Sequence, residues 1–216
     1  MEAPRISSWR AWRNRRLSGL IHRWWSVAVE AGAIGPGSRL GRSFGSFGQH
    51  SVICFPPNTI FNEGYIHIGR NTMIGPHCTL SAGMVPGQVC LTDRVVEIGD
   101  RCLIGKGSGI VGHFSIRIGD DVWTGHDVYI TDQNHGYEDV NLPISVQTMP
   151  EREVSIGSGS WIGHGSVVLP GARIGEHVVI GANSVVTGEI PSYSVAVGVP
   201  ARVIKQYRQN AWVDVT

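Results

Sequence analysis

The sequence has 216 residues, of which 18 are Lys or Arg and 17 are Asp or Glu, so the formal net charge is +1. This length allows one sizeable domain, and the balanced charge excludes the strongly basic class of nucleic-acid-binding proteins. Glycine supplies 29 residues. That is about twice its usual share of ~7%, so we expect a chain with many tight corners.

The first 30 residues form a basic, tryptophan-rich segment. Four of the seven tryptophans lie here, and only Glu2 and Glu30 are acidic. Apolar residues recur at the spacing of one helix face, which predicts an amphipathic α-helix within residues 1–31. The arginines are Arg5, Arg10, Arg13, Arg15, Arg16 and Arg23, and the apolar face comprises Leu17, Leu20, Ile21, Trp24 and Ala28.

Two interpretations of this segment stay open. It contains no apolar run of the length of a transmembrane helix or a secretory signal. Arginines combined with tryptophans are typical of a helix that lies on an anionic membrane surface. The other interpretation is a helix that caps the open end of a repeat structure. One helix could do both.

Further along the chain, an aliphatic residue recurs every six residues. The most regular stretch begins at Ile156 and runs without a miss to Val186. A fixed internal period indicates a repeat architecture. The positions are Ile68, Ile74, Leu80, Ile98, Ile104, Ile110, Ile118, Thr124, Ile130, Ile156, Ile162, Val168, Ile174, Ile180 and Val186, with Thr124 the one polar member.

The period favours strands over helices. Six residues turn an α-helix through roughly 600°, so a six-residue stripe cannot keep to one helix face. In a strand every second residue points the same way. The aliphatic residue and the residue four after it therefore share one side, and the latter is small or β-branched: Cys102, Ser108, Val122, Val128, Ser160, Ser166, Ala172, Val178 and Ser184. We predict a β-solenoid with a buried aliphatic column. Glycine would form its sharp corners after the aliphatic residue, at Gly157, Gly163, Gly175 and Gly181.

The four cysteines fit the same repeat. Cys78 and Cys102 fall on the small inward position, which predicts buried, free thiols that act as small hydrophobes. A disulfide or zinc framework would need a Cys-x-x-Cys cluster, which the sequence lacks. Free cysteines favour a reducing, cytoplasmic setting.

Two interruptions of the repeat, near residues 83–94 and 131–153, predict loops that leave the solenoid. Such insertions often carry the binding face of a repeat protein. The second contains His135, whose imidazole could take a proton from a hydroxyl near neutral pH. A loop histidine is more often a solvated surface residue, and its place in an interruption is what favours catalysis. Glu138 and Asp139 are both candidates to orient the ring.

Two segments carry a family resemblance. Residues 154–205, which end in Pro-Ala-Arg-Val-Ile-Lys, resemble the C-terminal signature of the hexapeptide-repeat acyltransferases. Their sugar O-acetyltransferase and streptogramin acetyltransferase branch is the most similar. Residues 134–144 (Asn-His-Gly-Tyr-Glu-Asp-Val-Asn-Leu-Pro-Ile) resemble the catalytic loop of that branch. The resemblance covers roughly residues 66–206.

The resemblance implies an all-β, left-handed parallel β-helix that forms a homotrimer, with acetyl-CoA or another acyl-CoA in the cleft between neighbouring subunits. It implies a CoA-dependent O-acyltransferase in which His135 is the general base and a carbohydrate or glycan precursor is the acceptor. No metal is expected. The residues that would bind CoA are Gly163, Ala182 and Thr187 along the pantetheine and adenine parts, with Arg202 and Lys205 near the phosphates. Without a role in CoA binding, Gly163 and Ala182 would simply be corner residues of the solenoid, and Arg202 and Lys205 would belong to a solvated tail.

Two positions depart from the pattern of the sugar acetyltransferases. Gly107 occupies the position at which the maltose and galactoside enzymes have an acceptor-binding asparagine, so that sugar contact is not carried over. Gly188 follows Thr187, where those enzymes usually have a lysine, which weakens the expected binding of CoA. The expected organisation is a helical segment at 1–31, the β-helix at 32–198 with its two loops, and a tail at 199–216.

Three other functions are compatible with a β-solenoid and would need different residues or a different acceptor. A γ-type carbonic anhydrase needs two zinc-binding histidines four or five residues apart, and no pair of the nine histidines has that spacing. A non-catalytic solenoid scaffold would need neither the loop histidine nor the basic ending, and an antibiotic hydroxyl could replace the glycan as acceptor. We expect no nucleic-acid partner and a cytoplasmic protein, with peripheral membrane contact through residues 1–30 as an open alternative.

Overall fold

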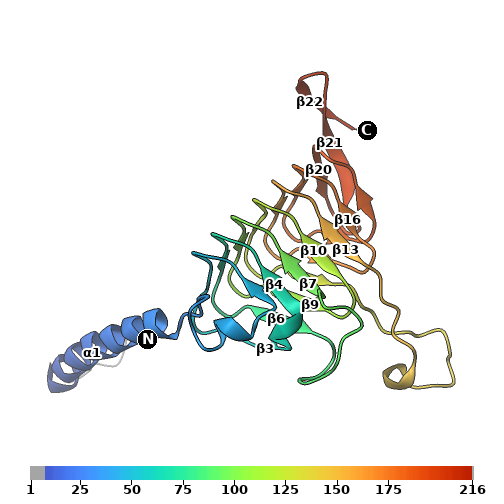
Figure 1. Cartoon of the computed structure of the whole chain (residues 1–216). Helices are drawn as coiled ribbons and strands as arrows, with labels where there is room; N and C mark the ends of the chain where they lie inside the picture. The colour runs from blue at the N-terminus through green and yellow to red at the C-terminus, as the bar shows by residue number, and fades with distance from the viewer. Residues whose placement is uncertain (1–7, 216) are drawn as a thin grey trace, which may run out of the picture.

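Residues 8–215 are described by the computed structural model, in which short strands stack into the three walls of a parallel β-helix (Figure 1). Each turn of the chain adds one strand to each wall, so strands three apart in the sequence are hydrogen-bonded neighbours. This is the solenoid that the six-residue period predicts.

The three sheets contain seven, nine and six strands. The seven-stranded sheet comprises β1 (Ser46–Phe47), β4 (Ile66–Ile68), β7 (Val96–Ile98), β10 (Ile116–Ile118), β13 (Val154–Ile156), β16 (Arg173–Ile174) and β19 (Glu189–Ile190). The nine-stranded sheet comprises β2 (Val52–Ile53), β5 (Met73–Ile74), β8 (Leu103–Ile104), β11 (Trp123–Thr124), β14 (Trp161–Ile162), β17 (Val179–Ile180), β20 (Ser194–Val197), β21 (Arg202–Arg208) and β22 (Ala211–Asp214). The six-stranded sheet comprises β3 (Ile60–Phe61), β6 (Thr79–Ala82), β9 (Gly109–Gly112), β12 (Tyr129–Thr131), β15 (Val167–Val168) and β18 (Val185–Val186).

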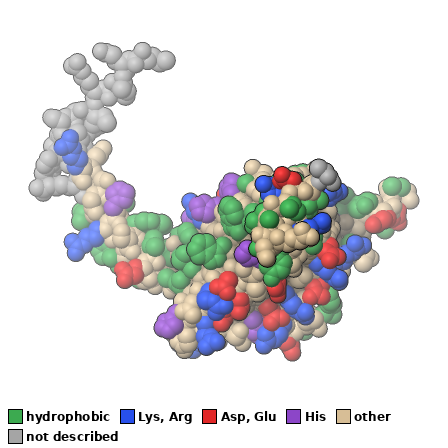
Figure 2. All heavy atoms as spheres, turned by 90° about the horizontal axis from the view of Figure 1, so that it is seen from above, with side chains coloured by type: hydrophobic (Ala, Val, Ile, Leu, Met, Phe, Trp, Pro, Cys, Tyr) green, Lys and Arg blue, Asp and Glu red, His purple; other side chains and the backbone are tan. Residues whose placement is uncertain are grey.

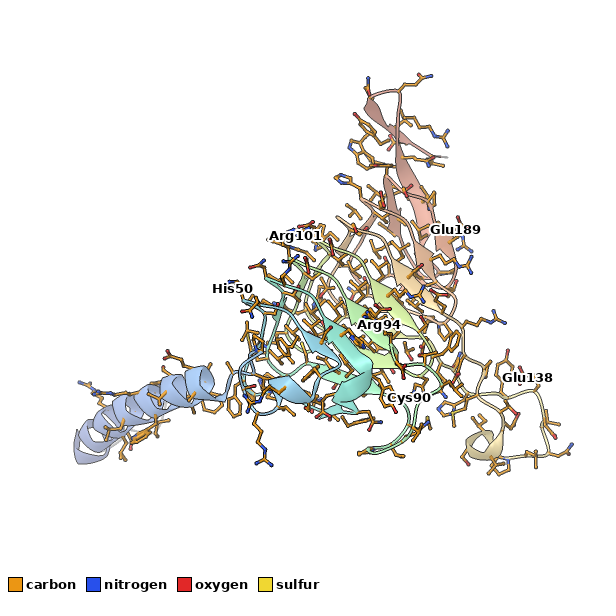
Figure 3. The ribbon with its side chains drawn as sticks, viewed as in Figure 1. His50, Cys90, Arg94, Arg101, Glu138 and Glu189 are labelled. Atoms are coloured by element: carbon orange, nitrogen blue, oxygen red, sulfur yellow. The ribbon has the colours of Figure 1, made fainter. Side chains whose placement is uncertain are left out.

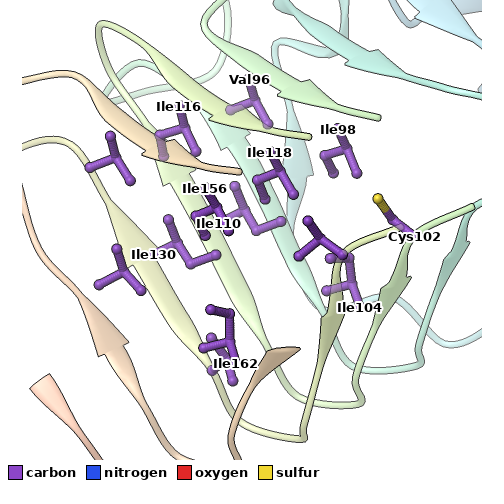
Figure 4. Packing of buried hydrophobic residues seen from close by; sticks show 14 of the residues in the cluster. Val96, Ile98, Cys102, Ile104, Ile110, Ile116, Ile118, Ile130, Ile156 and Ile162 are labelled. Carbon is purple, nitrogen blue, oxygen red and sulfur yellow. The ribbon is translucent and has the colours of Figure 1, made fainter. Parts of the chain in front are cut away.

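The predicted aliphatic column forms the core of the β-helix (Figure 4). All of its members, including Thr124, are buried. The hydroxyl of Thr124 accepts the N–H of Gly105 and donates to the carbonyl of Gly125, so the one polar member is satisfied inside the core. Burying each isoleucine contributes about 1.5–3 kcal/mol relative to an exposed side chain.

The small inward positions are also buried, as predicted. Ser160 and Ser166 bind backbone groups of the next coil, which removes the cost of burying a hydroxyl. Cys78 and Cys102 are buried, and all four cysteines are free.

The reason for the repeated glycines differs from the predicted one. The residue with positive φ lies three after the aliphatic residue, at Gly159 and Gly165 or at His177 and Asn183 in other coils. The glycine directly after the aliphatic residue is instead required by close stacking. A Cβ on Gly163 would lie 2.5 Å from the backbone nitrogen of Ala182 in the next coil.

The N-terminal helix α1 (Ser8–Gly32) leaves the β-helix instead of covering it (Figure 1). It contacts the first coil near its C-terminal end, where the rings of Trp25 and Phe55 are 6.4 Å apart between centroids. Residues 33–45 cover that end of the core, with Ile34 and Phe44 buried. The cap-only interpretation of the helix is therefore wrong for its described side chains. Arg5 lies outside the described residues, as do the side chains of Trp9, Arg10, Trp12, Arg13 and Arg16.

Two loops leave the β-helix at one corner because they follow β6 and β12, which belong to the same sheet. The first connects β6 to β7, and the second, longer one connects β12 to β13 and contains the short 3-10 helix η3 (Ile144–Val146). Two other 3-10 helices, η1 (Gly41–Ser43) and η2 (Glu63–Tyr65), belong to the first coils. At the far end, the C-terminal residues form an antiparallel hairpin, β21–β22, on the edge of β20.

Candidate active site

An open cleft of about 290 Å³ lies at the corner from which the β12–β13 loop leaves. His135 lies on this loop, and Glu138 marks the same loop in Figure 3. Thr187, which follows β18, belongs to the same lining. The cleft is lined by Asn134, His135, Tyr137, Glu138, Pro150, Arg152, Leu169, Pro170 and Thr187.

A buried carboxylate fastens the base of the loop to the coil below. Asp132 is 0% exposed. Its Oδ1 accepts the backbone N–H of His113 at 2.8 Å, and its Oδ2 accepts those of Phe114 at 2.8 Å and Ser115 at 2.6 Å. Such charge-assisted bonds are stronger than neutral ones. Asp132 therefore fixes where the loop that carries His135 begins.

The backbone on both sides of His135 is held as well. The N–H of Asn134 donates to the carbonyl of Pro150 at 3.2 Å, and the N–H of Gly136 donates to the carbonyl of Thr148 at 3.1 Å. Gly136 is buried, and a Cβ at this position would collide with the carbonyl of Thr148. Only glycine permits this pairing of the two loop strands next to the histidine.

The ring of His135 is exposed, and within residues 8–215 no hydrogen bond joins it to either predicted orienting residue. Glu138 Oε2 accepts the backbone N–H of Tyr137 at 2.9 Å, and this bond lowers the pKa of the Glu138 carboxyl. Asp139 Oδ1 accepts the N–H of Asn141. Both carboxylates shape the loop, and the imidazole stays free to meet a ligand in the cleft.

A second histidine lies under the loop. His113 is almost fully buried directly after β9, whose Val111 pairs with Thr131 of β12. Burial lowers the pKa of His113 below its ordinary value; the neighbouring His135 acts in the same direction, while Asp132 and Glu151 oppose it. Burial thus favours the neutral form of the His113 imidazole.

The residues predicted to bind CoA fall into three groups. Thr187 shares the cleft with His135. Gly163 and Ala182 lie one above the other at the corner between the nine- and six-stranded sheets, where the glycine allows the two coils to approach. Arg202 and Lys205 lie on β21. The N–H of Ala201 donates to the carbonyl of Val185 at 2.8 Å, which brings Arg202 to the end of the β-helix near Thr187.

Lys205 is engaged within the hairpin, where its Nζ is 3.4 Å from Asp214 Oδ1. Arg202 is exposed and has no ion-pair partner among residues 8–215; its Nη1 donates only to the carbonyl of Ala201, at 2.9 Å. Of the two predicted phosphate-binding residues, Arg202 is therefore the one whose charge is free.

The two departures from the family pattern have different structural contexts. Gly107 has a φ of +75°, a region that Asn71 and Asn183 also adopt at the corresponding corners, and a Cβ there would meet the Oδ1 end of the Asp127 side chain, so an asparagine would require that side chain to move. At Gly188 a Cβ would meet no atom within 4 Å. A side chain could be added there without a clash.

The sequence did not identify Asp132, Gly136 or Arg152 as parts of the site. Asp132 is the acidic residue that directly follows a strand of the repeat, which was the available signal. Arg152, on the returning strand of the same loop, adds a cationic side chain to the lining of the cleft. A glycine directly after a candidate catalytic residue is the corresponding signal for Gly136.

A larger hollow of about 460 Å³ lies on the seven-stranded sheet. Its charged side chains are paired with acidic neighbours: Arg94 Nη1 is 2.7 Å from Glu97 Oε2, and Arg117 Nη1 is 3.1 Å from Glu153 Oε1. The loop cleft, with an exposed imidazole, is the better site for proton transfer to or from a bound hydroxyl or amine.

Known proteins resemble the chain in both sequence and fold. Residues 153–188 match the model described as "Bacterial transferase hexapeptide (six repeats)", and residues 95–132 match "Hexapeptide repeat of succinyl-transferase". A protein of Escherichia coli, "Putative lipopolysaccharide biosynthesis O-acetyl transferase WbbJ", is 37% identical over 161 residues, 71% of this chain and 78% of its own length. A "Probable acetyltransferase" of Mycobacterium tuberculosis is 37% identical over 147 residues, 68% of this chain but only 46% of that relative.

Among solved structures, a variant of AntD, an N-acyltransferase from Bacillus cereus, superimposes with a TM-score of 0.66 at 25% identity. The match covers 79% of this chain and 88% of that chain, whose structure contains dTDP-4-amino-4,6-dideoxyglucose and Coenzyme A. The fold is accordingly the left-handed β-helix of these acyltransferases.

Proposed function

This chain belongs to the hexapeptide-repeat acetyltransferases, and on that premise we propose that it is a CoA-dependent O-acyltransferase with His135 as general base. The observation that carries the proposal is the shared cleft. His135 and Thr187 come from segments 52 residues apart and line one opening. The first is the proposed base, and the second is a proposed contact of the acyl-CoA.

Acyl-CoA is the proposed donor, with acetyl-CoA as the first choice. The AntD structure contains Coenzyme A, and the similar relatives are named as acetyltransferases. In this chain the pantetheine would lie along Gly163 and Ala182, with Thr187 at the cleft. Arg202, whose charge has no acidic partner within the described residues, would meet the phosphates. A CoA donor implies a cytoplasmic reaction.

The proposed reaction is a single acyl transfer. His135 accepts the proton of the acceptor hydroxyl while the hydroxyl oxygen attacks the thioester carbonyl carbon of acyl-CoA. The resulting oxyanion needs a hydrogen-bond donor at the cleft. When the carbon–sulfur bond breaks, CoA leaves as the thiol after taking the proton from the imidazolium, so the base is regenerated. The products are an O-acyl ester and free CoA.

A carbohydrate or glycan precursor is the proposed acceptor class. The Escherichia coli relative is named for lipopolysaccharide biosynthesis, and the AntD structure contains a nucleotide-linked sugar. The cleft is open and polar, with Asn134, Glu138 and Arg152 available to hydroxyl groups. Gly107 leaves no side chain at the family's asparagine position, so the loop would supply the acceptor contacts.

Transfer to an amine is a second candidate, because AntD is an N-acyltransferase. An amino sugar in the same cleft would give an amide through the same attack on the thioester. The two candidates differ in the product bond and not in the donor.

We also propose that the active form is a homotrimer. The outward side chains of the seven-stranded sheet are largely charged, whereas those of the nine-stranded sheet are apolar: Met73, Leu103, Trp123, Trp161 and Val179. Trp123 and Trp161 are 57% and 54% exposed. A second copy on this face would bury both tryptophans, and sedimentation equilibrium should give three times the chain mass of 23.4 kDa.

The experiment incubates the protein with acetyl-CoA and a panel of hydroxyl and amino sugars, and follows CoA release and product mass. Alkaline hydroxylamine cleaves an oxygen ester but leaves an amide, so treatment of the isolated product separates the two candidates. His135→Ala should lower the rate by about 10²–10⁴, and His22→Ala, on α1, should not change it. An unchanged rate in His135→Ala would overturn the assignment of the base, and an amide product would replace the first candidate by the second.

A further inference from the structure

The C-terminal half of α1 presents an apolar face that no other part of the described chain covers. Leu17, Leu20, Ile21, Trp24 and Val27 are each about half exposed or more, and Trp24 reaches 71%. At 100° per residue these five side chains fall within about one third of the helix circumference. Figure 2 shows hydrophobic side chains along the helix where it leaves the β-helix.

The opposite face of the same turns is polar. Arg15, Ser18, His22 and Ser26 occupy it, and all are exposed. The contact with the β-helix is made near the C-terminal end of α1 by Trp25, which packs against Phe55, and the neighbouring Val29 is half-buried; both lie toward the polar side of the helix. The apolar face therefore takes no part in the contact between Trp25 and Phe55.

The charge of the segment indicates which surface would cover this face. Residues 1–30 carry six arginines and two glutamates, whereas the rest of the chain is slightly acidic. A second copy of the same helix would bring this positive charge against itself. An anionic lipid surface offers negatively charged headgroups to the arginines and acyl chains to the apolar face of the helix.

The length of the helix agrees with a surface position. Within residues 8–215, no helix is both long enough and apolar enough to cross a bilayer. The 15 residues from Leu17 to Ala31 span about 22 Å, which is enough to lie along the headgroup region with one face inserted.

We propose that α1 binds an anionic lipid surface, with Leu17, Leu20, Ile21, Trp24 and Val27 inserted among the acyl chains and the arginines at the headgroups. The β-helix is then attached to the membrane at its N-terminal end. This binding does not depend on the acyltransferase activity, so each can fail without the other.

The test is flotation of the full chain with vesicles of phosphatidylglycerol and phosphatidylcholine, compared with vesicles of phosphatidylcholine alone. Two double variants carry the same change in charge. Leu20→Glu with Trp24→Glu alters the apolar face, and Ser18→Glu with Ser26→Glu alters the polar face. We expect the first pair to lower the partition coefficient at least about tenfold and the second pair at most about threefold, because only the first pair removes large apolar side chains from the inserted face.

Binding should also weaken as salt rises, because the arginine contribution is screened. Circular dichroism and sedimentation would verify that both variants keep the wild-type fold and mass. Equal binding of the two double variants, or equal binding to uncharged vesicles, would overturn the proposal. So would dissociation of the oligomer by Leu20→Glu with Trp24→Glu together with no vesicle binding by the wild type, because a second copy would then be what covers the face.

Discussion

The carboxylate of Asp132 receives the backbone N–H of His113, with 2.8 Å between the nitrogen and Oδ1. This bond joins the start of the β12–β13 loop to the end of β9 in the coil below. Because His135 follows Asp132 by three residues, the position of the proposed base depends on a hydrogen bond to a residue nineteen positions earlier in the chain. The coil that contains β9 therefore fixes the start of the β12–β13 loop.

Asp132→Asn should destabilise the protein and misplace the loop. One oxygen of the amide can still accept, but its NH₂ group would face an N–H donor of Phe114 or Ser115. Leaving such buried groups unpaired should lower the free energy of unfolding by at least about 2 kcal/mol, measured by urea denaturation. Asp139→Asn, an exposed change in the same loop, is the control. Equal stability of the two variants would show that the buried carboxylate does not fasten the loop.

Gly188→Lys should tighten the binding of acyl-CoA. A side chain at this position meets no neighbouring atom, and it directly follows Thr187 at the proposed CoA path. An added ammonium would attract the phosphates, so we expect a dissociation constant several-fold lower at low salt, with the gain lost as salt is raised. Gly188→Gln is the uncharged control. A gain of the same size in the glutamine variant would point to packing in place of charge.

The stability of the fold should fall when the pH drops below the ordinary pKa of histidine. Burial lowers the pKa of His113, so in acid the unfolded chain binds a proton at this residue that the folded chain does not. Stability from this group is present above about pH 6.5 and is lost as the pH falls toward its folded pKa. Urea denaturation at pH 7.5 and 5.5 should show a smaller loss for His113→Gln than for wild type. His22→Gln, on the exposed helix, should leave the loss unchanged, and a loss in His113→Gln as large as in wild type would contradict the account.

Cys78 should be inert to alkylation in the folded protein. Burial raises the pKa of its thiol to about 11, so only about one thiol in a thousand is ionised at pH 8. Its Sγ also donates to the carbonyl of Gly105 at 3.2 Å. Mass spectrometry after iodoacetamide should find the half-exposed Cys90 labelled well before Cys78. Equal labelling rates without denaturant would mean that the coils open locally.

The sequence predicted the coils well because each coil repeats one local rule. Side-chain direction in a strand has a period of two, so the six-residue spacing identified Ile162, Ile180 and Ser166 as inward-facing before any long-range contact was known. The corner glycines were predicted for a local reason. The structure assigns those after the aliphatic residue to contact between coils, which the spacing within one coil does not report.

The site was less accessible to sequence reasoning because its loop has no period. His135 could be singled out from its residue type and its place in an interruption. The bonds of Asp132 to residues 113–115 and of Gly136 to Thr148 depend on a folded path that no local pattern encodes. The same holds for Lys205, a predicted phosphate contact whose ammonium group is paired with Asp214 across the C-terminal hairpin.

Calorimetric titration of the protein with acetyl-CoA tests the central claim most directly, because it needs no acceptor. The account predicts a dissociation constant in the micromolar range, as is common for enzyme substrates. Binding should be weakened by Arg202→Ala and retained in His135→Ala, since the base acts on the acceptor and not on the donor. The absence of measurable heat for acetyl-CoA, longer acyl-CoAs and free CoA with the well-folded protein would contradict the account and favour a non-catalytic solenoid.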